Sequence, residues 1–326
     1  MEEKLWKACA DGKVEEVIKL LQNSQIYINW QDSEYSRTPF YRACGFGHIE
    51  IVKLLLSDQR VDINKPQSEG GTPFFIACQK GHIEIVKLLL NDNRVDINKA
   101  NKNDATPFYI ACEKGHIEIV KLLLNDNRVD INKAMNNGAT PFFIACYNGH
   151  IEIVKYLLLN DQRVDINKAR NTGETPFLIA CYKGNLEVVK YLLACGREID
   201  INKKDIDGKT GLDWARQHSR NCPKIVELIE SFQRNPNETR AKLRKELGLP
   251  GKFILFLYTK YKKGKKIIQK IRSRRRKEKI RRRKEKVGRR KEKVGRRKEK
   301  VGRKEKRGRR KEEKRRSKKL KIMIVF

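Results

Sequence analysis

The chain has 326 residues and a formal net charge of +35 at pH 7. Residues from Gly251 onward hold 39 Lys and Arg against 7 Glu, a net charge of +32 that leaves +3 for the first 250 residues. This split excludes an evenly basic domain and indicates a nearly neutral folded part followed by a strongly basic tail. The charged start Met-Glu-Glu-Lys lacks the apolar run of a secretory signal, so we expect an intracellular protein, in the cytoplasm or the nucleus.

A Thr-Pro pair recurs along the first part of the chain at nearly constant spacing. The threonines are Thr38, Thr72, Thr106, Thr140 and Thr175, in steps of 34, 34, 34 and 35 residues. A period of this size is typical of proteins built from stacked structural repeats.

One such unit, residues 105–138, predicts two short helices. Thr106 suits a helix N-cap, and the proline after it suits the first helical position, so the first helix covers residues 107–114. Gly115 ends that helix in the left-handed conformation. The second helix, residues 116–124, is apolar nearly all round, so it needs neighbours on more than one side. Stacked copies of the unit would supply them.

Five full copies of this unit stand between two irregular ones. Residues 1–36 form an N-terminal capping repeat, which lacks Thr-Pro and has a polar outer side, and residues 209–232 form a C-terminal capping repeat. The full repeats cover residues 37–70, 71–104, 105–138, 139–173 and 174–208. The fourth carries one extra residue near the end of its second helix.

The segment 233–258 contains a short helix and an apolar run. Asn235 and Glu238 have the spacing of a capping box, which predicts where the helix begins. Its Leu243 and Leu247 either dock on the last repeat or belong to a loose, exposed helix, and the sequence favours neither.

The basic tail, residues 259–326, follows an apolar run at residues 253–258. That run is far shorter than the roughly 20 residues of a membrane span. We favour its packing on the C-terminal repeat over binding at a membrane surface. A seven-residue motif recurs in the tail, but one apolar residue per heptad and a glycine in each copy argue against a coiled coil. We expect the tail to be disordered or loosely helical.

The repeat unit resembles the ankyrin repeat family over roughly the first 230 residues. The matching residues in the unit are Thr106, Pro107, Ala111, Gly115, His116, Ile119, Val120, Leu122, Leu123, Asp130 and Asn132. The resemblance implies an all-α solenoid of helix-turn-helix repeats. It also implies a protein–protein interaction scaffold without enzymatic activity, in which hairpin tips and the first helices line a concave groove.

The unit departs from the family pattern in ways that affect the links between repeats. The family histidine that ties adjacent repeats is Tyr109 here, and the preceding leucine is Phe108, so we expect more of the tie to be apolar packing. Residues 127–130 (Asn-Arg-Val-Asp) replace the usual Gly-Ala-Asp turn.

The cysteines and histidines are explained by their places in the repeat. Adjacent stacked helices lie about 8–10 Å apart, beyond the roughly 7 Å limit between Cα atoms for a disulfide. We therefore expect six buried, reduced cysteines, which are Cys9, Cys44, Cys78, Cys112, Cys146 and Cys181.

Histidines spaced 34 residues apart cannot share a metal ion, and we expect each to open a second helix and to hydrogen-bond locally. These histidines are His48, His82, His116 and His150. We find no catalytic set, and we expect no metal, no cofactor and no small-molecule substrate.

The candidate partner-binding residues vary between repeats on the tips and the first helices. Tyr35, Phe46, Tyr147 and Tyr182 are the expected anchors, because binding energy concentrates on a few aromatic residues. The alternative is that these positions vary because they are merely solvated. The candidates are Tyr35, Phe46, Glu69, Lys80, Lys102, Asn103, Glu113, Lys114, Asn136, Asn137, Tyr147, Asn148, Thr172, Tyr182 and Lys183.

The tail supplies a candidate anion-binding run. Such a run suits sequence-independent nucleic-acid binding, nuclear import or binding to anionic lipid. The alternatives to a scaffold are therefore a nuclear, nucleic-acid-associated protein and a peripheral membrane adaptor, while the run is also compatible with a passive expanded repeat. The basic candidates are Arg274, Arg275, Arg276, Lys277, Arg281, Arg282, Arg283 and Lys284.

Overall fold

The computed structural model describes residues 1–217 and 223–249. These residues form fifteen α-helices and contain no β-strand, which confirms the expectation of an all-α repeat structure. The apolar run 253–258, the basic tail and the residues expected to bind anions lie outside the described residues.

The helices come in pairs along the chain. Their bounds are α1 (Glu2–Asp11), α2 (Val14–Leu21), α3 (Pro39–Phe46), α4 (Ile49–Ser57), α5 (Pro73–Lys80), α6 (Ile83–Leu90), α7 (Pro107–Glu113), α8 (Ile117–Leu124), α9 (Pro141–Tyr147), α10 (Ile151–Asn160), α11 (Pro176–Tyr182), α12 (Leu186–Ala194), α13 (Gly211–Gln217), α14 (Pro223–Arg234) and α15 (Pro236–Glu246). The two helices predicted over 107–114 and 116–124 are α7 and α8, each one residue shorter because a capping residue stands there. Helix α10 is longer than α8, where the extra residue was predicted.

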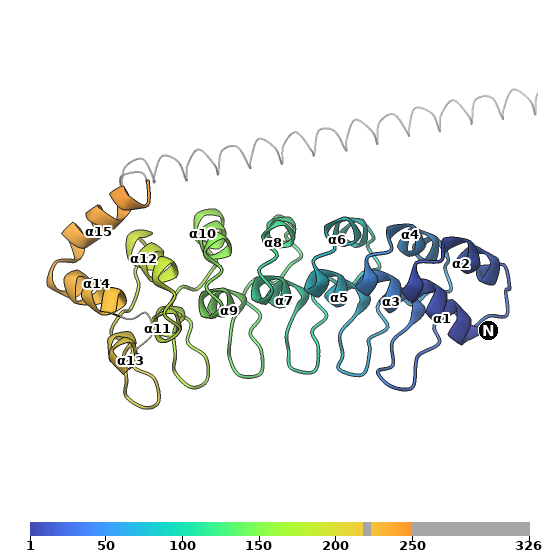
Figure 1. Cartoon of the computed structure of the whole chain (residues 1–326), viewed down its shortest axis with the longest axis horizontal. Coiled ribbons are helices and arrows are strands. Elements are labelled where there is room, and N and C mark those ends of the chain that lie inside the picture. Colours follow the sequence, from blue (N-terminus) through green and yellow to red (C-terminus); the bar gives the residue numbers. More distant parts are fainter. Residues whose placement is uncertain (218–222, 250–326) are drawn as a thin grey trace, which may run out of the picture. The chain divides into compact units, whose positions relative to one another are not determined.

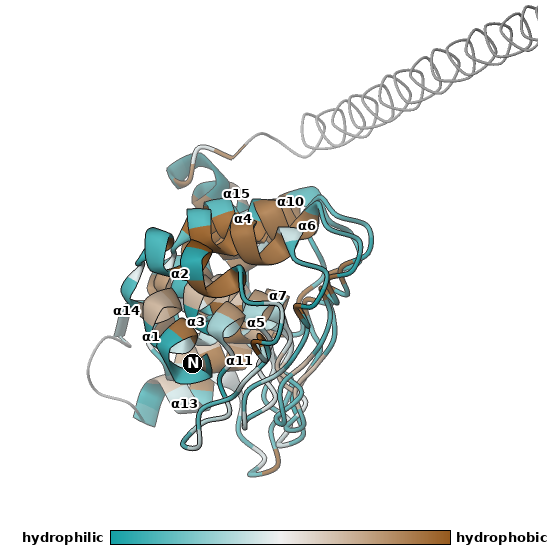
Figure 2. Cartoon of the chain, turned by 90° about the vertical axis from the view of Figure 1, so that its right-hand side faces the viewer, coloured by the Kyte–Doolittle hydropathy of each residue, from teal (hydrophilic) through white to brown (hydrophobic). Residues whose placement is uncertain are grey.

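The helix pairs stack into two rows, as Figure 1 shows. The odd-numbered helices α1 to α13 form an inner row, and the even-numbered helices α2 to α12 form an outer row; each helix packs on its neighbours in the row. The loops between repeats extend from the inner row as hairpins. Figure 2 shows apolar residues gathered on the helices, while the loops are mostly hydrophilic. One continuous apolar core joins the two rows.

The ends of the inner helices follow directly from the repeat sequence. Thr106 Oγ1 accepts a hydrogen bond from the Tyr109 N–H at 3.1 Å, and Pro107 stands at the first helical position. The four other repeat threonines make the same bond. Gly115 has a φ of +78°, in the left-handed region, as predicted.

The histidines do not hydrogen-bond locally, so that prediction is wrong. His116 Nε2 lies 3.0 Å from the Gln79 carbonyl oxygen, in the preceding repeat. His48, His82 and His150 bond the preceding repeat in the same way. The reason is the close approach of each imidazole to the glycine that ends the preceding inner helix. A polar link between repeats therefore exists, and it comes from the histidine that precedes each outer helix instead of the position that Tyr109 occupies here.

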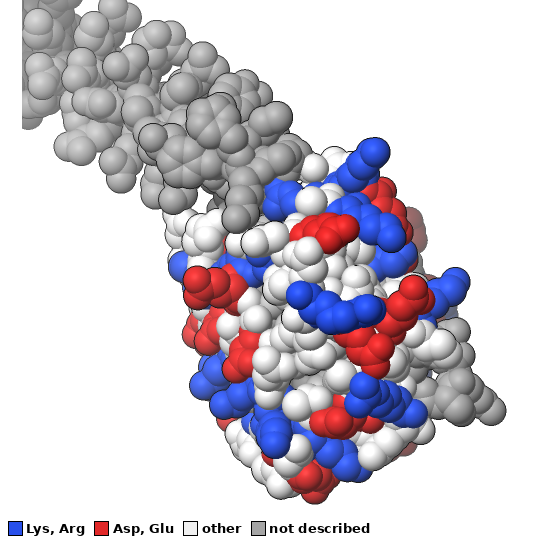
Figure 3. Space-filling view, turned by 90° about the vertical axis from the view of Figure 1, so that its left-hand side faces the viewer, with Lys and Arg blue, Asp and Glu red and all other residues white. Residues whose placement is uncertain are grey.

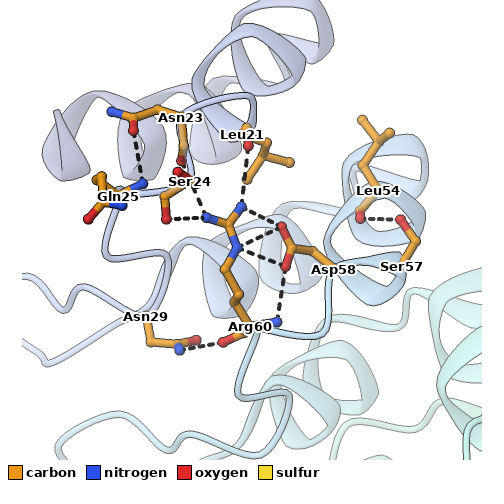
Figure 4. Close-up of polar contacts among 9 residues, drawn as sticks. All are labelled: Leu21, Asn23, Ser24, Gln25, Asn29, Leu54, Ser57, Asp58 and Arg60. Atoms are coloured by element: carbon orange, nitrogen blue, oxygen red, sulfur yellow. Dashed lines mark hydrogen bonds and ion pairs between the residues drawn. The ribbon is translucent and has the colours of Figure 1, made fainter.

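The residues that replace the Gly-Ala-Asp turn form a second polar link. Arg60 donates to the Leu21 carbonyl at 3.2 Å and to the Ser24 carbonyl at 3.0 Å, just after helix α2 ends (Figure 4). Asp58 holds the same guanidinium with an Nη2–Oδ2 distance of 2.7 Å. Arg94 and Arg128 repeat the arrangement on the carbonyls that end α4 and α6. Each arginine thus caps the outer helix of the preceding repeat.

Asparagines reinforce these loops on the same side. Asn29 Nδ2 donates to the Arg60 carbonyl at 2.8 Å, and Asn29 Oδ1 accepts from the Asp62 N–H at 2.8 Å. Asn64 and Asn98 make the same pair of bonds one and two repeats further on. Hydrogen bonds between side chains of one repeat and the main chain of a neighbouring repeat therefore stabilise the stack in addition to apolar packing.

Helix α15 docks on the last helix pairs, so of the two open alternatives the docked one is confirmed. It packs against α12 and α14, and the Leu243 side chain is only 3% exposed. Leu247 is partly buried against the same core. Asn235 caps the helix as predicted, because its side chain accepts from the Glu238 N–H.

Candidate interaction surface

The hairpin tips follow one another along the stack beside the inner helices (Figure 1), and the tips together with the exposed residues of α1, α3, α5, α7, α9, α11 and α13 are called here the inner surface. Main-chain N–H groups of each tip donate to the tip before it, in the pairs Ser68 to Tyr35 (2.8 Å), Lys102 to Glu69 (2.9 Å), Asn136 to Asn103 (3.2 Å), Asn171 to Asn137 (2.9 Å) and Ile206 to Thr172 (3.2 Å). These carbonyl groups are therefore used within the stack, and a partner would meet mainly side chains.

Several candidate side chains at the tips already have hydrogen-bond partners. Asn136 Nδ2 donates to the Lys102 carbonyl at 3.2 Å. Asn137 Oδ1 accepts from the Ala139 N–H at 3.0 Å within its own turn. Asn103 is exposed, and its side chain is free of such a bond among the described residues. The amides thus differ in how much of their hydrogen-bonding capacity remains.

The other polar candidates also differ in how strongly their side chains are already engaged by neighbouring residues. Asn148 Nδ2 donates to the Glu113 carbonyl at 2.9 Å, and the Glu113 carboxylate pairs with Lys114 at 3.0 Å. Glu69 and Lys102 lie 4.0 Å apart, both well exposed, an arrangement that contributes little to stability. The Thr172 hydroxyl donates to the Glu174 carboxylate.

An aromatic and arginine cluster lies at the N-terminal end of the inner surface. The Arg37 guanidinium lies 4.4 Å from the centroid of the Tyr35 ring and bonds the Asp32 carboxylate. Trp6 Nε1 donates to the Arg37 carbonyl at 2.9 Å. The Trp6 and Trp30 rings meet edge to face, with centroids 6.5 Å apart.

Arg42 occupies the middle of this cluster. Its guanidinium carbon lies 4.3 Å from the centroid of the Trp6 ring and 4.5 Å from that of Phe46. Its Nε is buried and has no hydrogen-bond partner among the described residues. Burial and the neighbouring Arg37 charge lower the pKa of Arg42 from its ordinary value. Two aromatic rings thus hold a cation whose hydrogen-bonding capacity is unfilled.

A second aromatic cluster lies at the C-terminal end. The Tyr182 and Trp214 rings meet edge to face, with centroids 5.2 Å apart. Lys183 Nζ lies 4.2 Å from the Tyr147 ring centroid and 5.4 Å from that of Tyr182. Lys209 Nζ lies 4.2 Å from the Trp214 ring. Each cation is within the roughly 6 Å at which a ring attracts it.

The structure brings the expected anchors together in two groups. Tyr147 and Tyr182 meet through Lys183, while Tyr35 and Phe46 are connected through arginines and Trp6. Three of the residues that make these connections, Trp6, Arg42 and Trp214, were not among the residues predicted from the sequence to bind a partner. The sequence alone distinguishes Arg42, because the four following repeats have isoleucine at its position.

The cations named here in the two rows of helices differ in whether they form ion pairs. In the outer helices of the five full repeats, α4 to α12, the lysine pairs with the glutamate three residues before it, as in Glu118 and Lys121 at 2.6 Å. Lys19 of α2 makes no ion pair among the described residues. Among the described residues of the inner row, Arg42, Lys80 and Lys183 make no ion pair. Figure 3 views the end of the stack formed by α13, α14 and α15, where basic and acidic residues lie side by side.

The repeat cysteines lie in the apolar core, where burial disfavours the thiolate form. Burial raises the pKa of the Cys9 thiol to about 12, and burial also raises the pKa of Cys112. The six repeat cysteines are buried and unbridged, as predicted. Within residues 1–217 and 223–249, no cluster of His, Cys, Asp and Glu is suited to hold a metal ion. None of the described helices is long and apolar enough to span a membrane.

Comparison with known proteins agrees with this architecture. A search of curated protein sequences found no significant match. The human ASB11 ankyrin repeat domain, a solved structure, is similar with a TM-score of 0.58 and 25% identity, covering 69% of this chain and 96% of that domain. The profile described as "Ankyrin repeats (3 copies)" matches residues 5–101, 74–169 and 158–239. Ankyrin repeats are generally protein–protein interaction modules and typically not enzymes. Because these matches cover well over half of its length, the chain belongs to the ankyrin repeat family.

Proposed function

We propose that the chain is a non-enzymatic scaffold that binds a partner protein on its inner surface. The observation that carries this proposal is the exposure of large aromatic side chains there. Phe46 is 52% exposed and Tyr35 is 46% exposed, although both are large side chains that water solvates poorly. Exposed aromatic residues beside arginine are the side chains on which interface binding energy concentrates.

The test uses the full chain and proximity labelling in cells, with quantitative mass spectrometry of the labelled proteins. The Tyr35→Ala, Phe46→Ala double variant is expected to reduce labelling of a defined partner by about tenfold or more, because such anchors carry roughly 2 kcal/mol or more each. Tyr27→Ala is the matched control, since Tyr27 is 55% exposed and follows the outer helix α2.

Tyr35 and Phe46 are better targets than Tyr182. Tyr182 packs on Trp214, so its truncation would also disturb the last repeat. Circular dichroism melting curves must show that the double variant folds like the parent chain. Retention of every partner by a folded double variant would exclude these two residues as anchors.

The second candidate function is anion binding by the basic tail, with the tail setting the protein's location in the cytoplasm or nucleus. The supporting observation is the net charge of +32 from residue 251 onward. The full chain is compared with a variant in which Arg274, Arg275, Arg276, Arg281, Arg282 and Arg283 are glutamine. Binding to duplex DNA, RNA and anionic vesicles is measured against salt. A smaller salt dependence in the variant for one ligand would support that ligand class. Equal, weak binding by both proteins near physiological salt would contradict the proposal.

A further inference from the structure

The inner surface carries cations that the fold leaves without carboxylate partners. In the five full repeats, the outer-helix lysine is neutralised by the glutamate one helical turn earlier. Arg42, Lys80 and Lys183 on the inner row make no ion pair among the described residues, and Lys80 and Lys183 are exposed. This difference between the two rows indicates that anionic groups from outside the stack would be attracted to the inner row.

Arg42 has the geometry of an anchor for a carboxylate. Its guanidinium is packed between the Trp6 and Phe46 rings, so it is held in place before any partner arrives. The terminal nitrogens of Arg42 make no hydrogen bond within the described residues. A guanidinium presents parallel N–H donors that match both oxygens of a carboxylate, which a lysine cannot do. Asp32 does not fill this role, because it bonds Arg37.

The spacing of the cations fits an extended polypeptide. Adjacent inner helices lie about 8–10 Å apart, and an extended chain rises about 3.3 Å per residue, so every third residue meets the next repeat. Lys80 and Lys183 occupy the same position in their repeats, just before the glycine that ends the inner helix. A peptide with acidic side chains at such intervals would place one carboxylate per repeat.

A nucleic acid fits the same surface less well. A DNA strand carries one negative charge per about 3.4 Å of helix axis, far denser than the unpaired cations Arg42, Lys80 and Lys183 along the five full repeats. The carboxylates of Glu69 and Glu113 also lie on the inner surface and would repel a uniformly charged backbone. The chain's own tail is excluded as occupant by its charge, since it has the same sign as the inner-row cations.

We propose that the inner row binds an acidic, extended segment of a partner protein, with Arg42 receiving one carboxylate and with Lys80 and Lys183 pairing with others further along. This inference rests on the proposed scaffold function and names the chemistry of its partner. The aromatic rings of Trp6, Phe46 and Tyr147 would supply apolar contact beside the charges.

Tryptophan fluorescence can report this binding, because the basic tail contains no tryptophan and gives no signal of its own. The whole chain has three tryptophans, Trp6, Trp30 and Trp214, and all of them belong to the two aromatic clusters. The full chain is titrated with a tryptophan-free peptide of about 15 residues with Glu at every third position, which spans roughly five repeats. A peptide with Gln in place of Glu is the control. A saturable fluorescence change is expected with the Glu peptide alone.

Matched variants locate the binding. Arg42→Gln is expected to weaken the affinity for the Glu peptide by about tenfold or more, because hydrogen bonds to charged groups contribute roughly 1.5–3 kcal/mol. Lys87→Gln removes the same charge from the outer row and is expected to leave the affinity unchanged. Where Arg42→Gln melts at a lower temperature than the parent chain, the exposed Lys80→Gln, Lys183→Gln double variant replaces it in the same titration.

Three results would overturn the inference. The first is an equal response to the Glu and Gln peptides. The second is equal weakening by Arg42→Gln and Lys87→Gln. The third is tighter, Arg42-dependent binding of a single-stranded RNA of the same charge, which would make the occupant a nucleic acid. If any of these occurs while the Tyr35→Ala, Phe46→Ala variant still loses its partner, the proposed scaffold function is supported, but the proposal that the bound segment is acidic is rejected.

Discussion

Arg244 donates from Nη1 to the main-chain carbonyl of Ala194 across 3.1 Å, at the end of outer helix α12. Arg240 donates to the carbonyl of Leu193 beside it at 3.2 Å. Earlier in the stack, Arg60, Arg94 and Arg128 reach the ends of outer helices from the following repeat. Helix α15 therefore supplies the arginines that a further repeat would have supplied, and so terminates the outer row.

Removing this terminal link should destabilise the C-terminal end of the stack. Arg244→Ala is expected to lower the free energy of unfolding by about 1–3 kcal/mol, since a buried carbonyl loses a charged donor. Urea unfolding of the full chain, followed by circular dichroism, measures the change. Lys242→Ala on the exposed side of α15 is the control and should have little effect. Equal stability of the two variants would show that α15 is not a structural cap.

Glycines that end the inner helices should tolerate a methyl group poorly. A Cβ at Gly115 would lie 2.8 Å from His150 Cε1, and the φ of +78° is itself strained for other residues. Gly208 has a φ of +72° but open space around it. Gly115→Ala should therefore lower the free energy of unfolding by about 1–3 kcal/mol more than Gly208→Ala does, because only the first substitution also displaces an imidazole. Differential scanning calorimetry of both variants tests this, and similar melting temperatures would disprove the clash. Gly115→Val should cost more still.

The histidine link between repeats should be replaceable by asparagine. Asn185 stands where the other repeats have histidine, and its Nδ2 donates to the Cys146 carbonyl at 2.8 Å. We expect His116→Ala to lower the free energy of unfolding by about 1 kcal/mol. His116→Asn should lower it by much less, because asparagine can make the same bond. Equilibrium urea curves of the two variants give the comparison. A loss as large for asparagine as for alanine would mean that the imidazole acts by packing alone.

The Asp–Arg loops should make stability depend on acidic pH. Hydrogen bonds from Arg60, Arg94 and Arg128 hold the pKa values of Asp58, Asp92 and Asp126 below their ordinary range. A depressed folded-state pKa gives stability that is present above the unfolded pKa of about 3.9 and is lost as the pH falls through the folded value.

Thermal unfolding of the full chain between pH 6 and pH 3, roughly the range that brackets the unfolded value, tests this dependence. In Arg128→Gln the unfolding temperature should fall less steeply with decreasing pH, since the pKa of Asp126 then stays nearer its ordinary value. The same decline in both proteins would assign the acid sensitivity to other carboxylates.

The features that the sequence predicted depend on residues close together in the chain. The Thr106 cap bonds a main-chain N–H three residues away, and Gly115 needs only its own backbone conformation. Asn235 likewise caps α15 through Glu238, three residues later. Because these bonds close within one helical turn, residue type and spacing were enough to place them.

The candidate site was predicted only in outline. Variation between repeats pointed to Tyr35 and Phe46 on the inner surface, but not to the partners that orient them. Trp6 and Arg42 stand 36 positions apart in the chain and meet only because α1 and α3 pack side by side. Sequence spacing carries no information about such a pair until the register of the stack is known.

The amino-acid sequence by itself determined the repeat, its helices, their caps and the division into a nearly neutral folded part and a basic tail. These properties follow from local hydrogen bonding, apolar periodicity and composition. Only the tertiary structure decided which partners His116, Arg60 and Arg244 have, since each bonds a carbonyl from about 30 to 50 residues away. Those bonds exist because stacking brings the end of one repeat's helix against the next, and that contact depends on packing rather than on neighbours in the chain.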